Sequence, residues 1–324
     1  MADLAGWGGG APHADEDALM RALADIVGGE AHGASGGIGD DAALIDPDLI
    51  WTVDAQVDGV HFRRDLSAPG DVGWKALAVS ISDCAAMGAA PVGALVSLVI
   101  ADGDVTSLEP IYAGLADCAR TYGCPVVGGD VARGPGLVLS VSVLGRAAVP
   151  PPRRAAARPG DVVAVTGDLG ASAAGLAALT DPALRDLPGA ADCMDRHRRP
   201  RPRLAEGARL ARQVHAMMDV SDGLATDLPR IARRSGVALE VDLDALPVGE
   251  AVRAVAAARG IAAGAFAATG GEDYELVVAL DPAAVADCGV PLTVIGEVVA
   301  GPGEVRWSGA GADAALRGWD HLAR

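Results

Sequence analysis

The sequence predicts an α+β fold divided into two domains. The chain has 324 residues, about twice the length of a domain of roughly 150 residues. Strand-like and helix-like segments occur in both halves, but they do not alternate as strictly as in a doubly wound sheet. The run Pro150–Arg154 contains three prolines, which cannot donate backbone hydrogen bonds to a sheet. We therefore predict domains at residues 1–148 and 149–324.

Glycine and proline delimit the elements expected in the N-terminal half. Leu19, Leu23 and Ile26 lie on one side of the first helix, and Pro69-Gly70 and Gly88 are typical of the two ends of the second. The strand at 49–54 should deliver Asp54 at its end. The expected elements are helices at 15–27, 71–88 and 107–122, and strands at 49–54, 92–101, 125–127 and 137–147.

The pattern restarts after the prolines. We expect a strand at 161–166, a helix from about Ala171, a charged loop at 196–203 and a helix at 204–213. A short apolar run then ends at Asp219, and helix, strand, helix and strand follow to the end of the chain. The second half is therefore also expected to mix helices and strands.

Composition excludes several classes of protein. A net charge of -17 argues against binding nucleic acid or an anionic membrane surface, and an anionic ligand would need divalent metal ions. The five cysteines form no CxxC pair and are expected to be reduced. No apolar run reaches the ~18 residues that span a bilayer, and no secretory signal is evident. We expect a cytoplasmic protein.

The usual phosphate-binding motifs are absent. Lys75 is the only lysine among 26 basic residues, and Ala76 follows it, so the sequence contains no P-loop. The glycines at 33–39 do not lie between a strand and a helix, as a dinucleotide fingerprint requires. If the protein handles phosphates, carboxylate-bound metal, arginine and backbone amides must do it.

Acidic residues recur beside glycine at the ends of predicted elements. Each Asp-Gly pair alone is typical of a turn, but oxygen ligands of this kind suit Mg²⁺. Asp83 differs because it lies in the apolar segment 79–87, where a carboxylate is costly unless a metal ion or an arginine accompanies it. The set comprises Asp40, Asp41, Asp54, Asp83, Asp130, Asp219, Asp222, Glu272 and Asp273.

Six ordered blocks resemble the thiamine-monophosphate kinase family, within the superfamily of aminoimidazole ribonucleotide synthetase, selenophosphate synthetase and the hydrogenase-maturation dehydratase. The resemblance extends from about residue 15 to the end of the chain. The blocks are 37–41 (GIGDD), 54–62 with its GVHF, 74–89 with WKALA and SD, 128–134 with GGD and RG, 219–224 (DVSDGL) and 270–276 (GGEDYEL).

This resemblance implies a fold, a reaction and a set of site residues. The N-terminal domains would pair into a homodimer whose sheets form a barrel. ATP and several Mg²⁺ ions would lie in a cleft, and thiamine monophosphate would become thiamine diphosphate. Implied metal ligands are Asp41, Thr52, Asp54, Asp83, Asp130, Asp219 and Asp222. Gly129, Asp130, Arg154 and Ser221 would contact ATP, and His61, Glu272 and Trp319 would contact the thiamine moiety. No catalytic base is implied, because the acceptor is itself a phosphate.

The sequence departs from the family pattern at two hydroxyl positions and at Ala55-Gln56, which is atypical between Asp54 and His61. Val53 and Val131 stand where hydroxyl residues are common, so a backbone carbonyl of Val53 would serve as the ligand, or one metal site would be weaker. The departures at Val53 and Val131 leave room for a non-catalytic nucleotide- or thiamine-phosphate-binding protein. Another ATP-using enzyme of the superfamily is a further alternative, although the glycine-rich loop lacks the reactive cysteine and lysine of selenophosphate synthetase.

Some residues also have plain structural interpretations. His61 is compatible with a core or turn histidine, and Trp319 with an anchor of the chain's tail. The basic segment Arg196–Arg203 is interpreted as a solvated loop that balances local acidity, rather than as a phosphate site. The segment Thr166–Gly170 could bind an anion at a helix N-terminus or serve as a capping turn.

Overall fold

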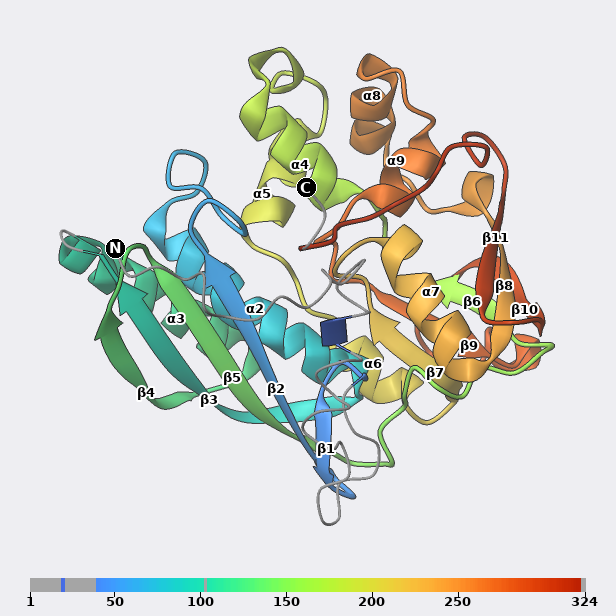
Figure 1. Cartoon of the computed structure of the whole chain (residues 1–324), viewed down its shortest axis with the longest axis horizontal. Helices are drawn as coiled ribbons and strands as arrows, with labels where there is room; N and C mark the ends of the chain where they lie inside the picture. The colour runs from blue at the N-terminus through green and yellow to red at the C-terminus, as the bar shows by residue number, and fades with distance from the viewer. Residues whose placement is uncertain (1–18, 21–38, 102–103, 322–324) are drawn as a thin grey trace, which may run out of the picture.

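The computed structural model describes residues 19–20, 39–101 and 104–321, which form two sheet-containing domains (Figure 1). The α+β class expected from the sequence is confirmed. Neither sheet closes into a barrel within the described part of one chain. Of the helix expected at 15–27, only Leu19 and Met20 are described, and both are helical; the glycine-rich segment before Gly39 lies outside the described residues.

The first domain is a five-stranded sheet with two helices on one face. β3 and β4 pair in parallel, whereas the other neighbouring strands are antiparallel. Its strands, in sheet order, are β1 (Ala43–Asp46), β2 (Leu49–Val57), β5 (Val138–Ala147), β3 (Ala89–Ile100) and β4 (Val126–Arg133), and its helices are α2 (Pro69–Ala86), η1 (Asp104–Ser107) and α3 (Leu108–Tyr122).

Helices α2 and α3 pack at unusually close range because glycines line their contact. Pro69 begins α2, where its missing N–H would have no partner in any case. A Cβ on Gly73 would lie 1.9 Å from the carbonyl oxygen of Ile111, and one on Gly114 would lie 1.8 Å from that of Gly70. Only glycine permits this spacing, and the close contact packs α2 tightly against α3 on this face of the sheet.

Among the described residues, the opposite face of the first sheet exposes many of its side chains and is partly apolar, and we call it the open face. Side chains alternate along each strand, so Val96 and Leu98 of β3 are buried under the helices while Leu95 is exposed. Trp51 and Val53 of β2 are exposed on the same open face, at 51% and 65%. Exposed apolar side chains gathered on one face of a sheet make that face a candidate contact surface.

The second domain contains a six-stranded sheet covered on both faces. One face packs against α4, α7, α8 and α9, and the other packs on α6 and the end of α2. Its strands, in sheet order, are β11 (Glu304–Ser308), β8 (Val237–Asp242), β10 (Thr293–Ala300), β6 (Val162–Val165), β9 (Leu276–Leu280) and β7 (Val214–Asp219). Its helices are α4 (Ala171–Thr180), η2 (Pro182–Leu184), α5 (Ala190–Arg198), α6 (Leu204–Leu210), α7 (Leu224–Ser235), η3 (Leu243–Ala245), α8 (Glu250–Ala258), α9 (Ala263–Thr269) and η4 (Pro282–Ala284).

The end of α2 joins the two domains. Ala85 and Ala86 share a buried cluster with Leu210 of α6 and Met217 of β7. A Cβ on Gly207 would lie 2.1 Å from the carbonyl oxygen of Ala85, so glycine lets α6 approach α2. Figure 1 shows α2 running from the first sheet toward β7. One helix therefore contributes side chains to both walls of the space between the domains.

Among the element boundaries that differ from those expected, two bear on the site. β2 continues to Val57, so Asp54 lies inside the strand rather than at its end. The GGD segment is expected to follow a short strand, yet it lies within β4, where Gly129 pairs with Val96. A Cβ on Gly129 would lie 1.9 Å from the carbonyl oxygen of Val96. Gly129 therefore allows β4 to lie close to β3 and does not form part of a loop.

No single helix in the described ranges is long and apolar enough to cross a bilayer. In the same ranges only the bent pair α8–α9, with 98° between its members, meets the length and composition criteria when its members are taken together. Both of these helices contribute buried side chains to the core of the second domain.

Candidate functional site

A cavity of about 1360 Å³ lies between the two domains. Its walls come from β2, the loop at 59–66, α2, the end of β7, α4, α7, the loop at 270–274 and the tail at 318–321. Of the site residues implied by the sequence, all except Gly129 and Asp130 line it. The cavity has two chemically distinct ends. We call the end with Asp41, Asp83 and Asp219 the carboxylate end, and the end with His61, Glu272 and Trp319 the acceptor end.

The carboxylate end brings together Asp41, Asp83 and Asp219. One oxygen from each lies within 4.8 Å of the others, although the residues come from the segment before β1, from α2 and from the end of β7. Asp41 is paired with Arg154 at 2.6 Å, while its Oδ2 is buried without a hydrogen-bond partner. A buried, unpartnered carboxylate oxygen beside two further carboxylates is the donor set that a hard divalent cation requires.

Hydroxyl groups orient these carboxylates. Ser82 donates to Asp219 Oδ2 at 2.6 Å, Ser80 donates to Asp54 Oδ2 at 2.8 Å, and Thr52 donates to Asp83. Burial, followed by the neighbouring carboxylates, raises the pKa of Asp83 well above its ordinary value. The sequence predicts a metal ion or an arginine beside Asp83, and the side chains that shift its pKa are those of Asp54, Asp219, Asp41 and Thr52. The cluster is therefore electrostatically unfavourable without a cation.

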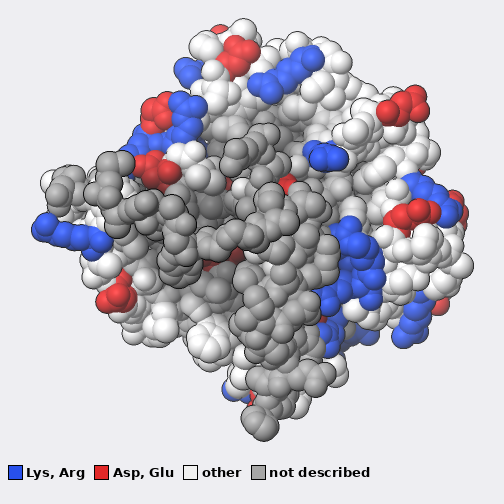
Figure 2. Space-filling view, viewed as in Figure 1, with Lys and Arg blue, Asp and Glu red and all other residues white. Residues whose placement is uncertain are grey.

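Several arginines lie close to the carboxylate end. Burial alone would lower the pKa of Arg154, but the carboxylate of Asp41 outweighs burial and raises it. Arg230 lies 2.8 Å from Asp222, and Arg233 and Arg234 also line the cavity. Figure 2 shows that basic side chains gather over α7 despite the overall negative charge. Ser221 lines the cavity at the turn between β7 and α7.

The acceptor end holds His61, Glu272 and Trp319. Val57 donates its N–H to His61 Nδ1 at 3.1 Å, so the neutral ring carries its proton on Nε2. Burial, then the nearby His321, lowers the pKa of His61. The rings of His61 and His321 are 5.1 Å apart, and those of His321 and Trp319 are 5.6 Å apart. These rings line one wall with a half-exposed Trp319, which suits a flat, cationic heterocycle.

The loop that carries Glu272 is strained and strongly anchored. Glu272 and Tyr274 have φ values of 65° and 52°, which non-glycine residues rarely adopt. Glu272 donates its N–H to the Ser221 carbonyl at 2.7 Å. Asp273 accepts the N–H groups of Gly170 and Ser172 at 2.6 and 3.1 Å, so a carboxylate of the protein itself occupies the start of the helix that follows residues 166–170.

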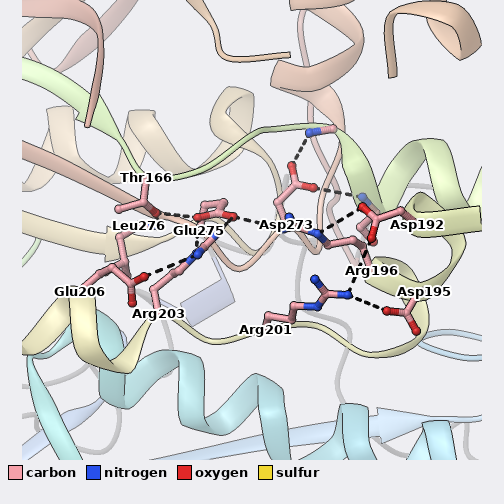
Figure 3. Close-up of polar contacts among 12 residues, drawn as sticks. Thr166, Asp192, Asp195, Arg196, Arg201, Arg203, Glu206, Asp273, Glu275 and Leu276 are labelled. Carbon is pink, nitrogen blue, oxygen red and sulfur yellow. Dashed lines mark hydrogen bonds and ion pairs between the residues drawn. The ribbon is translucent and has the colours of Figure 1, made fainter. Parts of the chain in front are cut away.

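A buried network fixes the end of this loop (Figure 3). Glu275 accepts the Thr166 hydroxyl at 2.7 Å and Arg203 Nε at 2.6 Å, and Arg196 lies 3.5 Å away. Arg199 of the same basic segment pairs with Asp71 of α2 at 2.6 Å. The interpretation of residues 196–203 as a solvated loop is therefore wrong: ion pairs hold the segment to Glu275 within the second domain and, through Arg199, to Asp71 of the first domain.

Two implied site residues, Gly129 and Asp130, lie away from the carboxylate end, and the side chain of Val53 points to the open face although its residue borders the cavity. The sheet register places Asp130 level with Ser97 of β3, on the open face that also exposes the Val53 side chain. Thr52 and Asp54 point to the opposite, helix-covered face. Gly129 and Asp130 on β4 are not among the residues that line the cavity. Within one chain, the structure does not bring them to the cluster.

Sequence reasoning missed several residues at the site. Ser80 and Ser82 give no signal beyond their position near Asp83 in α2. In the sequence, Lys75 serves only as evidence against a P-loop. Once Lys75 is known to be buried in the helix that carries Asp83, an acidic partner is expected for it. His197 and His321 lie too far along the chain from their neighbours for any local pattern to reveal them.

Family comparisons match nearly all of the described chain. The family described as AIR synthase related protein, N-terminal domain, matches residues 39–147, and the corresponding C-terminal domain matches residues 158–308. Thiamine-monophosphate kinase of Escherichia coli (strain K12) is 38% identical over 308 residues, which cover 89% of this chain and 92% of that protein. The enzyme of the same name from Rhodopirellula baltica is 36% identical, covering 81% and 83%.

Solved structures agree with this result. A structure described as AaThiL complexed with AMPPCP and TMP is 31% identical with a TM-score of 0.83, covering 95% of this chain and 97% of that one. Thiamine monophosphate kinase from Aquifex aeolicus is 30% identical with a TM-score of 0.77, covering 90% and 96%. The hydrogenase maturation protein HypE in complex with ATP, at 24% identity and a TM-score of 0.66 over 85% and 84%, shares the fold.

Proposed function

The chain belongs to the thiamine-monophosphate kinases of the AIR synthase related family, and from this premise we propose that it transfers the γ-phosphoryl group of ATP to thiamine monophosphate. The bond from the γ-phosphorus to the oxygen of ADP breaks, and a bond to a phosphate oxygen of thiamine monophosphate forms. The products are ADP and thiamine diphosphate. The observation that carries the proposal is a single cavity with a carboxylate cluster at one end and an aromatic, carboxylate-bearing wall at the other.

Several Mg²⁺ ions fit the carboxylate end. Asp41, Asp83 and Asp219 would hold them, with Asp54, Asp222 and the Thr52 hydroxyl close by. The unpartnered Asp41 Oδ2 and the mutual repulsion of the carboxylates support this assignment. When bound, Mg²⁺ neutralises phosphate charge and orients the phosphates for in-line transfer.

The chain's own residues then bind and position the two substrates. Arg154 and Ser221 would contact ATP, and Arg154 contributes a buried positive charge beside the carboxylates. Glu272, His61 and Trp319 would hold the thiamine moiety, whose thiazolium ring is a cation. A phosphate acceptor is already nucleophilic at neutral pH, so the reaction needs no strong base and none is assigned.

We further propose that the protein is a homodimer that pairs through the open face of the first sheet, as in a dimeric barrel. Trp51, Val53 and Leu95 form an exposed apolar surface there, which is unusual unless something covers it. Asp130 lies on this same face, away from the carboxylate end of its own chain. In a dimer, Gly129 and Asp130 would act at the cavity of the second copy.

Complementation between inactive variants tests this arrangement. Asp83→Asn and Asp130→Asn are each expected to be inactive. After their mixing and subunit exchange, half of the dimers would be mixed, and one of the two sites in each would be intact, so about a quarter of wild-type activity should return. Mixed dimers without activity, or a monomer in sedimentation analysis, would contradict the proposal.

The reaction itself is tested by product analysis. Purified protein is incubated with ATP, Mg²⁺ and thiamine monophosphate, and thiamine diphosphate and ADP are quantified by chromatography, with Asp83→Asn as control. We expect equal amounts of both products, lost in the variant. ADP without thiamine diphosphate would indicate another acceptor, and no ADP would indicate a binding protein.

A further inference from the structure

Lys75 connects the residues that form the acceptor end. Its Nζ lies 2.7 Å from Glu272 Oε1 and donates to the carbonyl oxygen of His61 at 3.0 Å. The Lys75 side chain is only 3% exposed, so both contacts are made behind the cavity wall. One buried ammonium group on α2 thus binds two separate loops, one from each domain, that both face the cavity.

The choice of lysine at this position is informative. The chain contains 26 basic residues, and all except Lys75 are arginine. An ammonium is compact and can direct donors to partners in different planes, whereas a guanidinium is a planar fork suited to carboxylate pairs. In a chain so strongly biased toward arginine, the single lysine occupies a site where its two partners are a carboxylate and a carbonyl on different loops.

Glu272 is held from its other side as well. His197 Nδ1 lies 3.3 Å from Glu272 Oε2 and 3.0 Å from the Ser172 hydroxyl. Burial, followed by the charge of Lys75, lowers the pKa of His197 to about 4, so its ring is neutral at physiological pH. The second oxygen of Glu272 therefore faces a neutral imidazole, and Lys75 supplies the positive charge.

We propose that Lys75 is a positioning residue for the acceptor: it fixes the Glu272 carboxylate and the His61 loop in the arrangement that binds thiamine monophosphate. This inference rests on the proposed function. Burial raises the pKa of Glu272, but Lys75, through its charge and its hydrogen bond, acts together with His197 and His61 in the opposite direction, and the pKa is lowered overall. An ionised Glu272 beside a cationic ligand is then the expected state in the complex.

The position of Lys75 on α2 also relates the two ends of the cavity. Lys75 and Asp83 lie on the same helix eight residues apart, a rise of about 12 Å. Glycine contacts with α3 hold this helix tightly against its neighbour. The helix therefore sets the distance between the carboxylate end and the loops that Lys75 holds at the acceptor end.

The test compares Lys75→Met with the matched control Arg199→Met. Arg199 also makes an interdomain ion pair with α2, at Asp71, but outside the acceptor end. Because misplacement of binding groups by about 1 Å costs up to ~100-fold, the KM for thiamine monophosphate should rise about 10- to 100-fold in Lys75→Met. The KM for ATP should stay within about two-fold, and Arg199→Met should leave both values near those of the wild type.

Two further variants separate positioning from general stability. Because Lys75 acts partly through Glu272, the double variant Lys75→Met/Glu272→Gln should raise the KM for thiamine monophosphate by less than the product of the two single effects; fully multiplied effects would overturn the inference. Lys75→Arg keeps the positive charge and provides a second test if Lys75→Met does not fold. If either folded Lys75 variant has an unchanged KM for thiamine monophosphate, the inference is wrong. Absence of product in the wild type would instead refute the proposed function.

Discussion

Replacing Asp83 with asparagine should stabilise the metal-free protein while abolishing its response to Mg²⁺. The amide side chain would keep the shape of the carboxylate and could still accept the hydrogen bond that Thr52 donates. The substitution removes one negative charge from a cluster whose oxygens lie within 4.8 Å of one another. A residue needed for function is thus expected to lower stability when its ligand is missing.

The magnitude follows from Coulomb's law. Two unit charges separated by 4.8 Å repel by about 3.5 kcal/mol at an effective dielectric constant of ~20, and Asp83 faces both Asp41 and Asp219. Burial and these neighbours raise the pKa of Asp83, so a bound proton relieves part of the repulsion. We expect a net gain of about 1–3 kcal/mol, or about 2–4 °C in melting temperature for each kcal/mol.

Glu275→Gln provides a control for which a loss of stability, rather than a gain, is expected. The Glu275 side chain is only 1% exposed, but it pairs with Arg203 and Arg196, and removal of one partner from a buried ion pair costs about 3–5 kcal/mol. Thermal unfolding is measured for the wild type and both variants in EDTA and in Mg²⁺ with nucleotide. If metal-free Asp83→Asn melts below the wild type, or if Mg²⁺ with nucleotide leaves the wild-type melting temperature unchanged, the electrostatic account of the cluster is wrong.

Three further outcomes follow from individual contacts. His197, with its pKa lowered from 6.5 to about 4, should not titrate by NMR between pH 8 and 5; since the unfolded chain binds the proton first, stability should fall as pH drops from 6.5 toward 4, and a midpoint near 6.5 would contradict this. Gly73→Ala places a Cβ 1.9 Å from the Ile111 carbonyl oxygen and should cost about 1–3 kcal/mol in chemical denaturation; an unchanged midpoint would count against the close helix contact. Thr52→Val removes the hydroxyl that orients Asp83 and should weaken Mg²⁺ binding about 10- to 100-fold in a thermal-shift titration, whereas unaltered affinity would show that the hydroxyl is not needed.

The carboxylate end could be predicted from the sequence because its residues carry local signals. Asp83 is acidic within an apolar helix, and Asp219 follows an apolar strand, so each indicates a site without knowledge of the other. The α+β class likewise follows from the mixture of helix and strand patterns, and the presence of two domains from the chain length and the run of prolines. Element boundaries are harder to predict, because Gly129 signals a loop in sequence but serves close strand approach in β4.

Long-range partners could not be predicted in the same way. The basic segment 196–203 has the composition of a solvated loop because its main acidic partner, Glu275, lies 72 residues from Arg203. The face on which Asp130 lies depends on the register between β3 and β4, which no local pattern specifies. Lys75 gives no positive signal because its partners, His61 and Glu272, become its neighbours only after the two domains pack together.

The most direct test of the central claim is transfer of label from ATP in a single turnover. Enzyme in excess is mixed with [γ-³²P]ATP, Mg²⁺ and thiamine monophosphate, and the products are separated after quenching. Transfer between the two ends of one cavity predicts that the label appears in thiamine diphosphate in step with ADP formation. Label recovered as inorganic phosphate, with no labelled thiamine diphosphate, would contradict the proposed phosphoryl transfer.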